Sequence, residues 1–441
     1  MSASTGLHDL TKQVEETTCC VVGGGPAGAM LALLLARQGV EVTLLEAHRD
    51  FERDFRGDTL HASAMEILDE IGLADRLLGL RHAKVRHFTV PTKGGAFTFD
   101  LFAGLRTKFP YIVVMAQSRF LEFITEEAKR YPNFRLVMGG RVEELLEEDG
   151  VVRGVRYRGR DSWHEVHATL TVGADGRFSK VRKLAGFEPI KTSSPIDVLW
   201  FRISRREDDP KEALAARVGS GLFLVFINRF DYWQVGCTIV KGSYKEVRAA
   251  GLGRLRRSLA RVAPEWADRF DELKETKQIP VLSVEVSRLK RWHKPGLLLI
   301  GDAAHVMSPV GGVGINYAIQ DAVVAAGVVG EKLRTRTPVR EQDLAEVQRR
   351  RELPTRVIQT FQSLAQRGVA RGVLSSEDER AFAVPRFVLP LLKSPRLLAI
   401  PARFLSFGLR PPRVETGKEI ATRAEDDSSF ELPPKMRRKN N

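Results

Sequence analysis

A glycine-rich turn between an apolar run and a helix-like segment constrains the fold of this chain more than any other feature. Residues 18–22, Thr-Cys-Cys-Val-Val, have the apolar character of a buried parallel strand, and Gly-x-Gly-x-x-Gly follows at 23–28. Pro26–Gln38 is small and apolar with helical spacing, and Gly39 stands where a left-handed helix cap is favoured. Val40–Glu46 alternates as a second strand. The sequence therefore predicts a βαβ unit with a Rossmann nucleotide site at its first turn.

Each glycine of the turn has a separate predicted role. The first permits the tight turn, the second lets the backbone approach a pyrophosphate, and the third lets helix and strand pack closely. The helix N-terminus offers free N–H groups and partial positive charge to that anion. Glu46, which follows Gly28 by 18 residues, ends the second strand, where a carboxylate accepts the hydroxyls of an adenosine ribose. The turn alone fits NAD and FAD equally; its predicted binding residues are Gly23, Gly25, Pro26, Ala27 and Gly28.

Two later segments each place an aspartate at the carboxyl end of a predicted strand. Asp175 follows the run 170–173, and Asp302 follows the run 296–300. Ligands bind at that edge of open α/β sheets. Glycines near 311–314 precede a small-residue helix, whose amino end stabilises negative charge by ~0.3–2 kcal/mol. The predicted cofactor contacts in this second segment are Gly301, Asp302, Pro309, Gly312, Gly314, Ile315 and Asn316.

The three motifs, in this order and spacing, resemble those of the group A flavoprotein monooxygenases, the p-hydroxybenzoate hydroxylase-like family, over about residues 17–330. The stretches 17–28, 56–61 and 291–296 look like a bacterial branch described as FAD-dependent oxidoreductases. The resemblance implies that the bound nucleotide is FAD. Carried over position by position, it implies cofactor contacts at Glu46, Arg56, Gln117 or the neighbouring Arg119, Asp175 and Asp302.

The resemblance also implies a reaction. NADPH or NADH reduces FAD, dioxygen adds to the reduced flavin, and the flavin hydroperoxide hydroxylates an aromatic or polycyclic small molecule. The substrate is expected between the flavin and an inserted sheet, and no catalytic base is assigned. The residues predicted to line the substrate pocket are His61, Trp200, Arg202, Phe226, Tyr232, Gln234 and, beside the flavin ring, Pro309.

Other functions fit parts of the same pattern. A flavin-dependent reductase or dehydrogenase of prenyl or polyene chains would share the fold, and a non-catalytic protein could bind FAD or an aromatic ligand without turnover. A flavin halogenase is disfavoured, because the five tryptophans are too far apart for the Trp-x-Trp-x-x-Pro signature.

The fold class that follows is α/β. We expect a Rossmann-type FAD-binding domain of three layers (ββα), an inserted mixed β-sheet domain for the substrate, and a C-terminal helical region. The predicted FAD domain is discontinuous, over 1–85, 112–190 and 280–335. The substrate domain comprises 86–111 and 191–279, and the helical region comprises 336–441.

Composition limits the classes of partner and the cellular compartment that we expect for this chain. The net charge of +14 comes from scattered Lys and Arg, whereas a nucleic-acid binder concentrates them on one element, so no nucleic-acid partner is expected. Three sparse cysteines favour a reducing compartment and predict neither a disulfide frame nor a metal site. No apolar run is long enough to span a bilayer. We expect a cytoplasmic monomer or homodimer whose C-terminal region, rich in Pro, Leu, Phe and basic residues, can contact a membrane surface.

Overall fold

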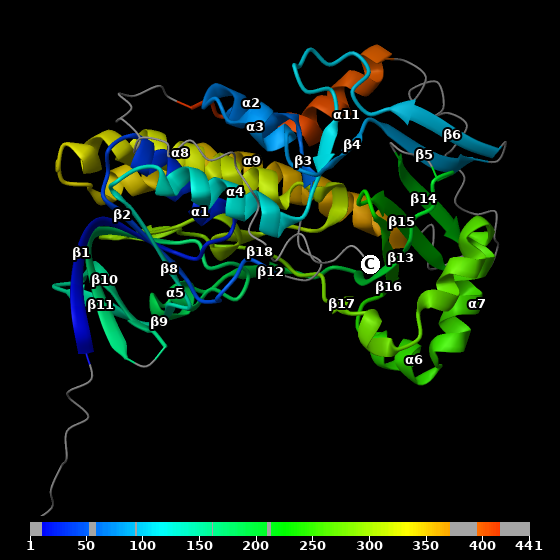
Figure 1. Ribbon diagram of the computed structural model, residues 1–441, viewed down its shortest axis with the longest axis horizontal. Helices are drawn as coiled ribbons and strands as arrows, with labels where there is room; N and C mark the ends of the chain where they lie inside the picture. The colour runs from blue at the N-terminus through cyan, green and yellow to red at the C-terminus, as the bar shows by residue number, and fades with distance from the viewer. Residues whose placement is uncertain are drawn as a thin grey trace, which may run out of the picture.

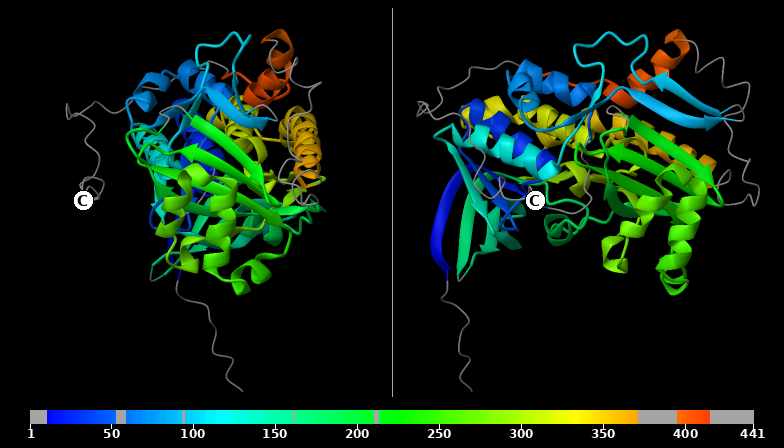
Figure 2. Two further views of the ribbon diagram at one scale, coloured as in Figure 1. Left: turned by 90° about the vertical axis from the view of Figure 1, so that its right-hand side faces the viewer. Right: turned by 45° about the vertical axis from the view of Figure 1, so that its right-hand side comes forward.

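The computed structural model describes residues 11–52, 59–92, 95–160, 162–209, 213–370 and 395–414. Two large sheets lie at opposite ends of the molecule, and the long helices α8 (Gly314–Arg334) and α9 (Glu341–Val369) run between them (Figures 1 and 2). The mixed α/β fold class predicted from the sequence is confirmed.

The first sheet is built around the predicted βαβ unit. Its parallel strands run in the order β20–β11–β1–β2–β8, and the helices α1, α4 and α8 cover one face. β9 and β10 extend the sheet beside β11 in antiparallel fashion, and β19 pairs antiparallel with β20. The bounds are β1 Thr11–Val22, α1 Pro26–Arg37, β2 Val42–Glu46, α4 Gln117–Lys129, β8 Phe134–Met138, β9 Arg141–Glu148, β10 Val151–Arg158, β11 Trp163–Gly173, β19 His293–Lys294 and β20 Leu297–Leu299.

Local geometry follows the sequence pattern closely in this sheet. Gly39 takes φ 85° just after α1, and Asp149 and Gly150 take φ 50° and 75° in the β9–β10 hairpin, as an Asp-Gly turn requires. The sequence of 134–158, with its Asp-Gly turn, predicts a β-meander, and this prediction is wrong for the first strand. β8 follows helix α4 and pairs parallel with β2, because a strand that returns through a helical crossover enters the sheet in the same direction.

The second sheet has the order β17–β13–β16–β15–β14–β5–β6. The helices α6, α7 and η1 cover one of its faces with an apolar core that includes Phe201, Phe226 and Trp233. Because β5 and β6 precede the rest by about a hundred residues, the sheet joins two separate stretches of chain. Its elements are β5 His87–Thr92, β6 Gly95–Asp100, β13 Ile196–Ser204, β14 Ala213–Gly219, β15 Leu222–Asn228, β16 Tyr232–Val240, β17 Val281–Leu282, α6 Tyr244–Ala249, α7 Leu252–Val262 and η1 Pro264–Glu272.

Smaller elements connect the two sheets. They include two three-stranded sheets, β3–β7–β4 and β12–β18–β21, and several short helices. The bounds are β3 Thr59–Leu60, α2 Ala62–Glu70, α3 Ala74–Leu78, β4 Ala83–Val85, β7 Ile112–Val114, α5 Lys180–Leu184, β12 Ile190–Thr192, η2 Thr276–Gln278, β18 Val286–Arg288, η3 Gly301–Ala303, β21 His305–Val306, η4 Val310–Gly312 and α11 Pro395–Phe407.

One helical segment of the described chain, Val310–Arg334, is long and apolar enough to cross a membrane. Of its most apolar stretch, however, 78% is buried within this fold. It packs between α1 and α9, as the core helix of a soluble protein does.

A buried ion pair anchors the second sheet to its covering helices and predicts an acid-sensitive stability. Burial alone raises the pKa of Asp209, but hydrogen bonds from Arg269, from the backbone of Arg206 and from Trp233 outweigh it and hold the pKa at about 2. A carboxyl group with a depressed pKa stabilises the fold above its unfolded pKa of about 3.9, and this contribution disappears as the pH falls toward 2.

We therefore expect Asp209→Asn to lower the free energy of unfolding at neutral pH by about 2–3 kcal/mol. The difference from the wild type should shrink between about pH 4 and pH 2. Urea unfolding followed by tryptophan fluorescence measures both effects. Asp208→Asn, at the exposed neighbouring position, is the matched control and should change little. An unchanged gap across this pH range would contradict the assignment.

Candidate functional site

The three motifs meet at the carboxyl ends of adjacent parallel strands. An added Cβ on Gly23 would lie 2.5 Å from the carbonyl oxygen of Ala174, and one on Gly301 would lie 2.9 Å from the Cβ of Ala27. Ile300 donates its N–H to the carbonyl of Gly173 at 3.0 Å. Segments separated by up to 278 residues are therefore in direct contact at one edge of the first sheet.

The glycine turn is closed at its ends and open in its middle. Gly23 takes φ 104°, and an added Cβ on Gly28 would lie 2.0 Å from the carbonyl oxygen of Gly23. Gly25 is the N-cap of α1, with Pro26 at the first helical position, and, apart from its chain neighbours, no atom of the described residues lies within 4 Å of the place its Cβ would take. Backbone approach by a phosphate is thus sterically open at Gly25, next to a helix N-terminus. These residues fit the pyrophosphate of FAD.

Glu46 ends β2 with its carboxylate turned back over this turn. Oε2 accepts the N–H of Gly24 at 2.9 Å, and Oε1 accepts the N–H of His48 at 2.9 Å. The side chain is buried and held in one orientation. An acceptor is therefore fixed beside the turn, at the strand end where the ribose of a dinucleotide binds.

The carboxylate of Asp175 is used within its own segment. It accepts hydrogen bonds from the hydroxyl of Ser179, from the backbone N–H of Lys180 at 2.7 Å and from that of Val181 at 3.0 Å. Burial raises its pKa despite these hydrogen bonds. Arg182, one turn further on, donates to the carbonyl of Ala303 at 3.0 Å. In this structure Asp175 shapes the loop, and Arg182 joins that loop to the Gly301–Asp302 segment.

The Gly301–Asp302 segment is held by a buried aspartate that sequence reasoning missed. Asp321 of α8 accepts the N–H of Gly301 at 3.0 Å, Nε2 of His305 at 2.6 Å and Nε of Arg351 at 2.7 Å. Burial by itself raises the pKa of Asp321, but the charges of His305 and Arg351 hold it below its ordinary value. A sequence signal existed, since Asp321 is the only charged residue between Gly314 and Gly330.

The glycines before α8 pack against the short strand β3. Gly311 and Gly312 take φ 79° and 62°, and the hydroxyl of Thr59 donates to the carbonyl of Gly312 at 2.9 Å. The amide of Asn316 donates to the carbonyls of Thr59 and Gly312 at 3.0 and 3.2 Å. The side chain of Asn316 therefore fixes this loop, whereas Gly314 and Ile315 begin α8 and Pro309 lies half-buried before it.

His61 lies at the same place, covered by the C-terminal helix α11. Its backbone N–H donates to Oδ1 of Asn316 at 2.8 Å, and its Nδ1 lies 3.1 Å from the carbonyl of Leu405. Burial lowers the pKa of His61 to about 4, so the ring is neutral at ordinary pH. Its Nε2 is buried. The contact with Leu405 shows that residues more than three hundred positions away complete this side of the site.

The substrate-side candidates separate onto two faces of the second sheet. Strand register places Arg202 opposite Gln234 and Trp200 opposite Gly236, on the face that the helices α6 and α7 leave uncovered. Ser204 pairs with Tyr232, whose ring lies 4.9 Å from the guanidinium of Arg202. Phe226 was predicted to line the pocket but points to the helix-covered face, where it stacks on Trp266 at 4.0 Å. Side chains alternate along a strand, so Phe226 belongs to the core.

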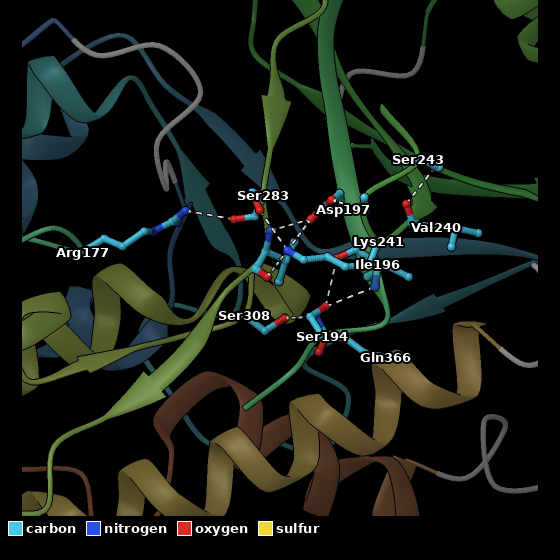
Figure 3. Close-up of polar contacts among 12 residues, drawn as sticks. Arg177, Ser194, Ile196, Asp197, Val240, Lys241, Ser243, Ser283, Ser308 and Gln366 are labelled. Carbon is cyan, nitrogen blue, oxygen red and sulfur yellow. Dashed lines mark hydrogen bonds and ion pairs between the residues drawn. The ribbon is translucent and has the colours of Figure 1, made fainter. Parts of the chain in front are cut away.

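A polar junction ties this sheet to the Asp175 loop (Figure 3). Asp197 accepts from Nζ of Lys241 at 2.7 Å and from the N–H of Val284 at 2.9 Å. Arg177, two residues after Asp175, donates to the carbonyl of Ser283 at 3.2 Å. These contacts join the two segments that run between the sheets, near Asp197 and Val284, to each other, and Arg177 joins them to the first sheet.

The remaining predicted contacts come from helix α4 and from an undescribed stretch. Gln117 and Arg119 lie in the first turn of α4 and are half-buried. The guanidinium of Arg229, from the second sheet, reaches the carbonyl of Met115 just before them at 3.3 Å. Arg56 falls outside the described residues.

Comparison with known proteins finds relatives over most of the chain. A family model described as an FAD binding domain matches residues 16–360. The chain is 34% identical over 410 residues to 6-methylpretetramide 4-monooxygenase of Streptomyces rimosus, covering 91% of this chain and 94% of that protein. It is 29% identical to rifampicin monooxygenase of Streptomyces venezuelae, over 68% of this chain and only 61% of that longer protein. The crystal structure of p-nitrophenol 4-monooxygenase from Pseudomonas putida has a TM-score of 0.70 at 22% identity, covering 90% of this chain and all of that one.

Proposed function

Because the chain belongs to the group A FAD-dependent aromatic monooxygenases, we propose that its substrate is a polycyclic aromatic molecule lying against the face of the second sheet opposite α6 and α7. Proteins of this family hydroxylate aromatic compounds with FAD, NAD(P)H and dioxygen, and this chain is such an oxidoreductase. Two of the relatives, 6-methylpretetramide 4-monooxygenase and rifampicin monooxygenase, act on polycyclic molecules. This supports a substrate with more than one ring.

The observation that carries the proposal is the position of Trp200. An added Cβ on Gly236 would lie 2.9–3.0 Å from two atoms of the Trp200 ring, so the indole lies across this glycine, along the sheet. Its Nε1–H is buried, and no described residue accepts a hydrogen bond from it. Arg202 and the buried amide of Gln234 occupy the next pair on the same face. A flat ring beside several N–H donors suits an aromatic molecule with carbonyl or phenol oxygens.

The chain's own groups have definable tasks in this reaction. When bound, FAD supplies the redox chemistry and the activation of dioxygen. The open backbone at Gly25 would hold its pyrophosphate and Glu46 its ribose, and Asp302 lies on the same edge of the sheet. The amino end of α8 favours negative charge beside the loop at Gly311 and Gly312. The packing of Leu405 on His61 and Gly311 closes one side against water.

A ligand panel tests the proposed substrate class. Purified protein carrying FAD is mixed with NADPH or NADH and with phenols of one ring, fused-ring phenols and quinones, and polyene chains. Fused-ring compounds should accelerate NAD(P)H oxidation more than single-ring compounds do. Stimulation by single-ring phenols or polyenes alone would contradict the substrate class. A protein that binds FAD without stimulation by any compound would favour the non-catalytic alternative.

Replacing Trp200 tests the pocket directly. Trp200→Phe keeps an aromatic ring and removes the N–H, so we expect KM for the accelerating compound to rise about five- to tenfold with kcat changed little. Steady-state kinetics measures the two constants separately. Trp163→Phe, at the start of β11 and far from the motif edge of the sheet, is the matched control. Equal changes in KM for the two variants would show that Trp200 does not line the substrate pocket.

We also propose the domain division and the setting predicted from the sequence. Pairing of β5 with β14 supports grouping 86–111 with 191–279 as the substrate domain. A cytoplasmic location, a monomeric or homodimeric state and peripheral membrane contact by the C-terminal region remain predictions. Sedimentation analysis and vesicle binding test the last two.

A further inference from the structure

A cavity outside the cofactor and substrate sites is walled by arginines. Its volume is about 240 Å³, and it opens between α8, α9 and the chain that follows α11. Val323, Val324 and Gly327 form an apolar floor on α8. None of the described residues that line the cavity is acidic. Its walls carry four cationic side chains, those of Arg350, Arg351, Arg410 and Arg413.

Arg351 is the buried member of this group, and only part of its guanidinium is used. Its side chain is 1% exposed, and its Nε donates to Asp321 at 2.7 Å. Nη1 and Nη2 are buried and have no hydrogen-bond partner among the described residues. A buried donor without a partner costs free energy that a ligand can recover. The guanidinium thus retains N–H groups for an acceptor inside the molecule.

Arg350 is paired with Glu346 at 2.7 Å, whereas the other two arginines are weakly neutralised. Within the described part of the chain, Arg413 has one ion pair, with Glu70 at 3.9 Å, and Arg410 has none. The cavity therefore has an excess of positive charge.

The segment that supplies Arg410 and Arg413 is held in place over α8. The backbone N–H of Val414 donates to Glu70 of α2 at 2.7 Å, and the amide of Gln320 in α8 donates to the carbonyl of Phe407 at 3.1 Å. Figure 1 shows this last described segment passing beside α2. The arginines are therefore carried by a segment fixed at two points.

We propose that this cavity binds the phosphate group of a small organic molecule. Arginine forks match phosphate oxygens better than any other side chain, and several of them around one cavity are typical of phosphate recognition. The volume is several times the ~30 Å³ of a water molecule, so a phosphate fits with part of its organic group. The valine floor suits that apolar part. The phosphate belongs either to a soluble ester or to the headgroup of an anionic lipid.

Calorimetric titration of the FAD-loaded protein tests the proposal. Inorganic phosphate and butyl phosphate are the probes, at one fixed ionic strength, because the net charge of +14 attracts anions non-specifically. We expect one saturable site per chain and tighter binding of butyl phosphate. Arg410→Gln should weaken binding about tenfold.

A control variant tests the specificity of binding, and a vesicle assay identifies the source of the phosphate. Arg403→Gln, on α11 beside Phe407 and outside the cavity lining, removes the same charge and should leave binding unchanged. Vesicles of phosphatidylcholine and phosphatidylglycerol that retain the wild type but not Arg410→Gln assign a lipid headgroup, whereas butyl phosphate binding without vesicle retention assigns a soluble ester. Absence of saturable binding, or equal binding by the Arg410 and Arg403 variants, would overturn the proposal.

Discussion

Gly25→Val is expected to abolish FAD retention while the protein still folds. Within the part of the chain that the structure describes, only the chain neighbours of Gly25 lie within 4 Å of the position of an added Cβ, and the φ of −72° is accessible to valine. The added methyl groups would therefore occupy the space where the backbone must approach the pyrophosphate. We expect the dissociation constant for FAD to rise at least about a hundredfold, which corresponds to about 2.7 kcal/mol.

Flavin absorbance after purification and titration of the apoprotein with FAD measure this effect, and circular dichroism reports the fold. Gly253→Val, on the surface of α7, is the matched control, because its Cβ contacts only the tip of Arg257 at 3.5 Å. Gly28→Ala should behave differently and disrupt folding, since its Cβ would overlap the carbonyl of Gly23. A Gly25 variant that retains FAD with normal affinity would show that the pyrophosphate does not bind at this turn.

Arg351→Met is expected to cost the largest share of stability among single substitutions of charged residues, about 3–5 kcal/mol. Arg351 and Asp321 are 30 residues apart in the sequence but in contact in the fold. The methionine fills similar space but leaves the buried carboxylate of Asp321 with one cation fewer. In the wild type the pKa of Asp321 is depressed, so its contribution to stability is lost as the pH falls. In the variant the pKa of Asp321 rises, and protonation then relieves the penalty. The stability gap should therefore be widest at neutral pH and narrow in acid.

Urea unfolding of the wild type and the variant at neutral and mildly acidic pH measures the gap. Arg350→Met, at the neighbouring half-exposed position, is the control and should cost less than about 1 kcal/mol. The double variant Arg351→Met with Asp321→Asn removes both charges and should recover part of the loss. A double variant no more stable than Arg351→Met alone would contradict a direct charge interaction.

Local features of the fold were predictable because they are fixed by neighbours in sequence. The turn at Gly23–Gly28, the left-handed Gly39 and the Asp149–Gly150 hairpin depend on backbone conformations that few other residues adopt. The joining of three distant motifs at one sheet edge was predictable from their shared position at strand ends, since parallel strands end at the same edge.

Features that depend on register or on distant partners were not predictable. Phe226 and Gln234 both lie in strands, and both have side chains suited to a substrate pocket. Only the pairing of Phe226 with Val235 shows that Phe226 faces the helices. The hydrogen bonds of Asn316 to Thr59, and of His61 to Leu405, join segments about 250 and 340 residues apart. No periodicity in the sequence encodes such contacts. Asp321 is the exception, because a lone charge in an apolar helix indicates a buried partner.

Mass analysis of the product formed under isotopically labelled dioxygen tests the central claim most directly. The protein, saturated with FAD and supplied with NAD(P)H, is given the fused-ring compound that most accelerates NAD(P)H oxidation. A monooxygenase places one labelled oxygen atom in a new hydroxyl group of the product, and the gain should be absent when NAD(P)H is omitted. A product that is reduced or desaturated and carries no label under any condition would contradict aromatic hydroxylation.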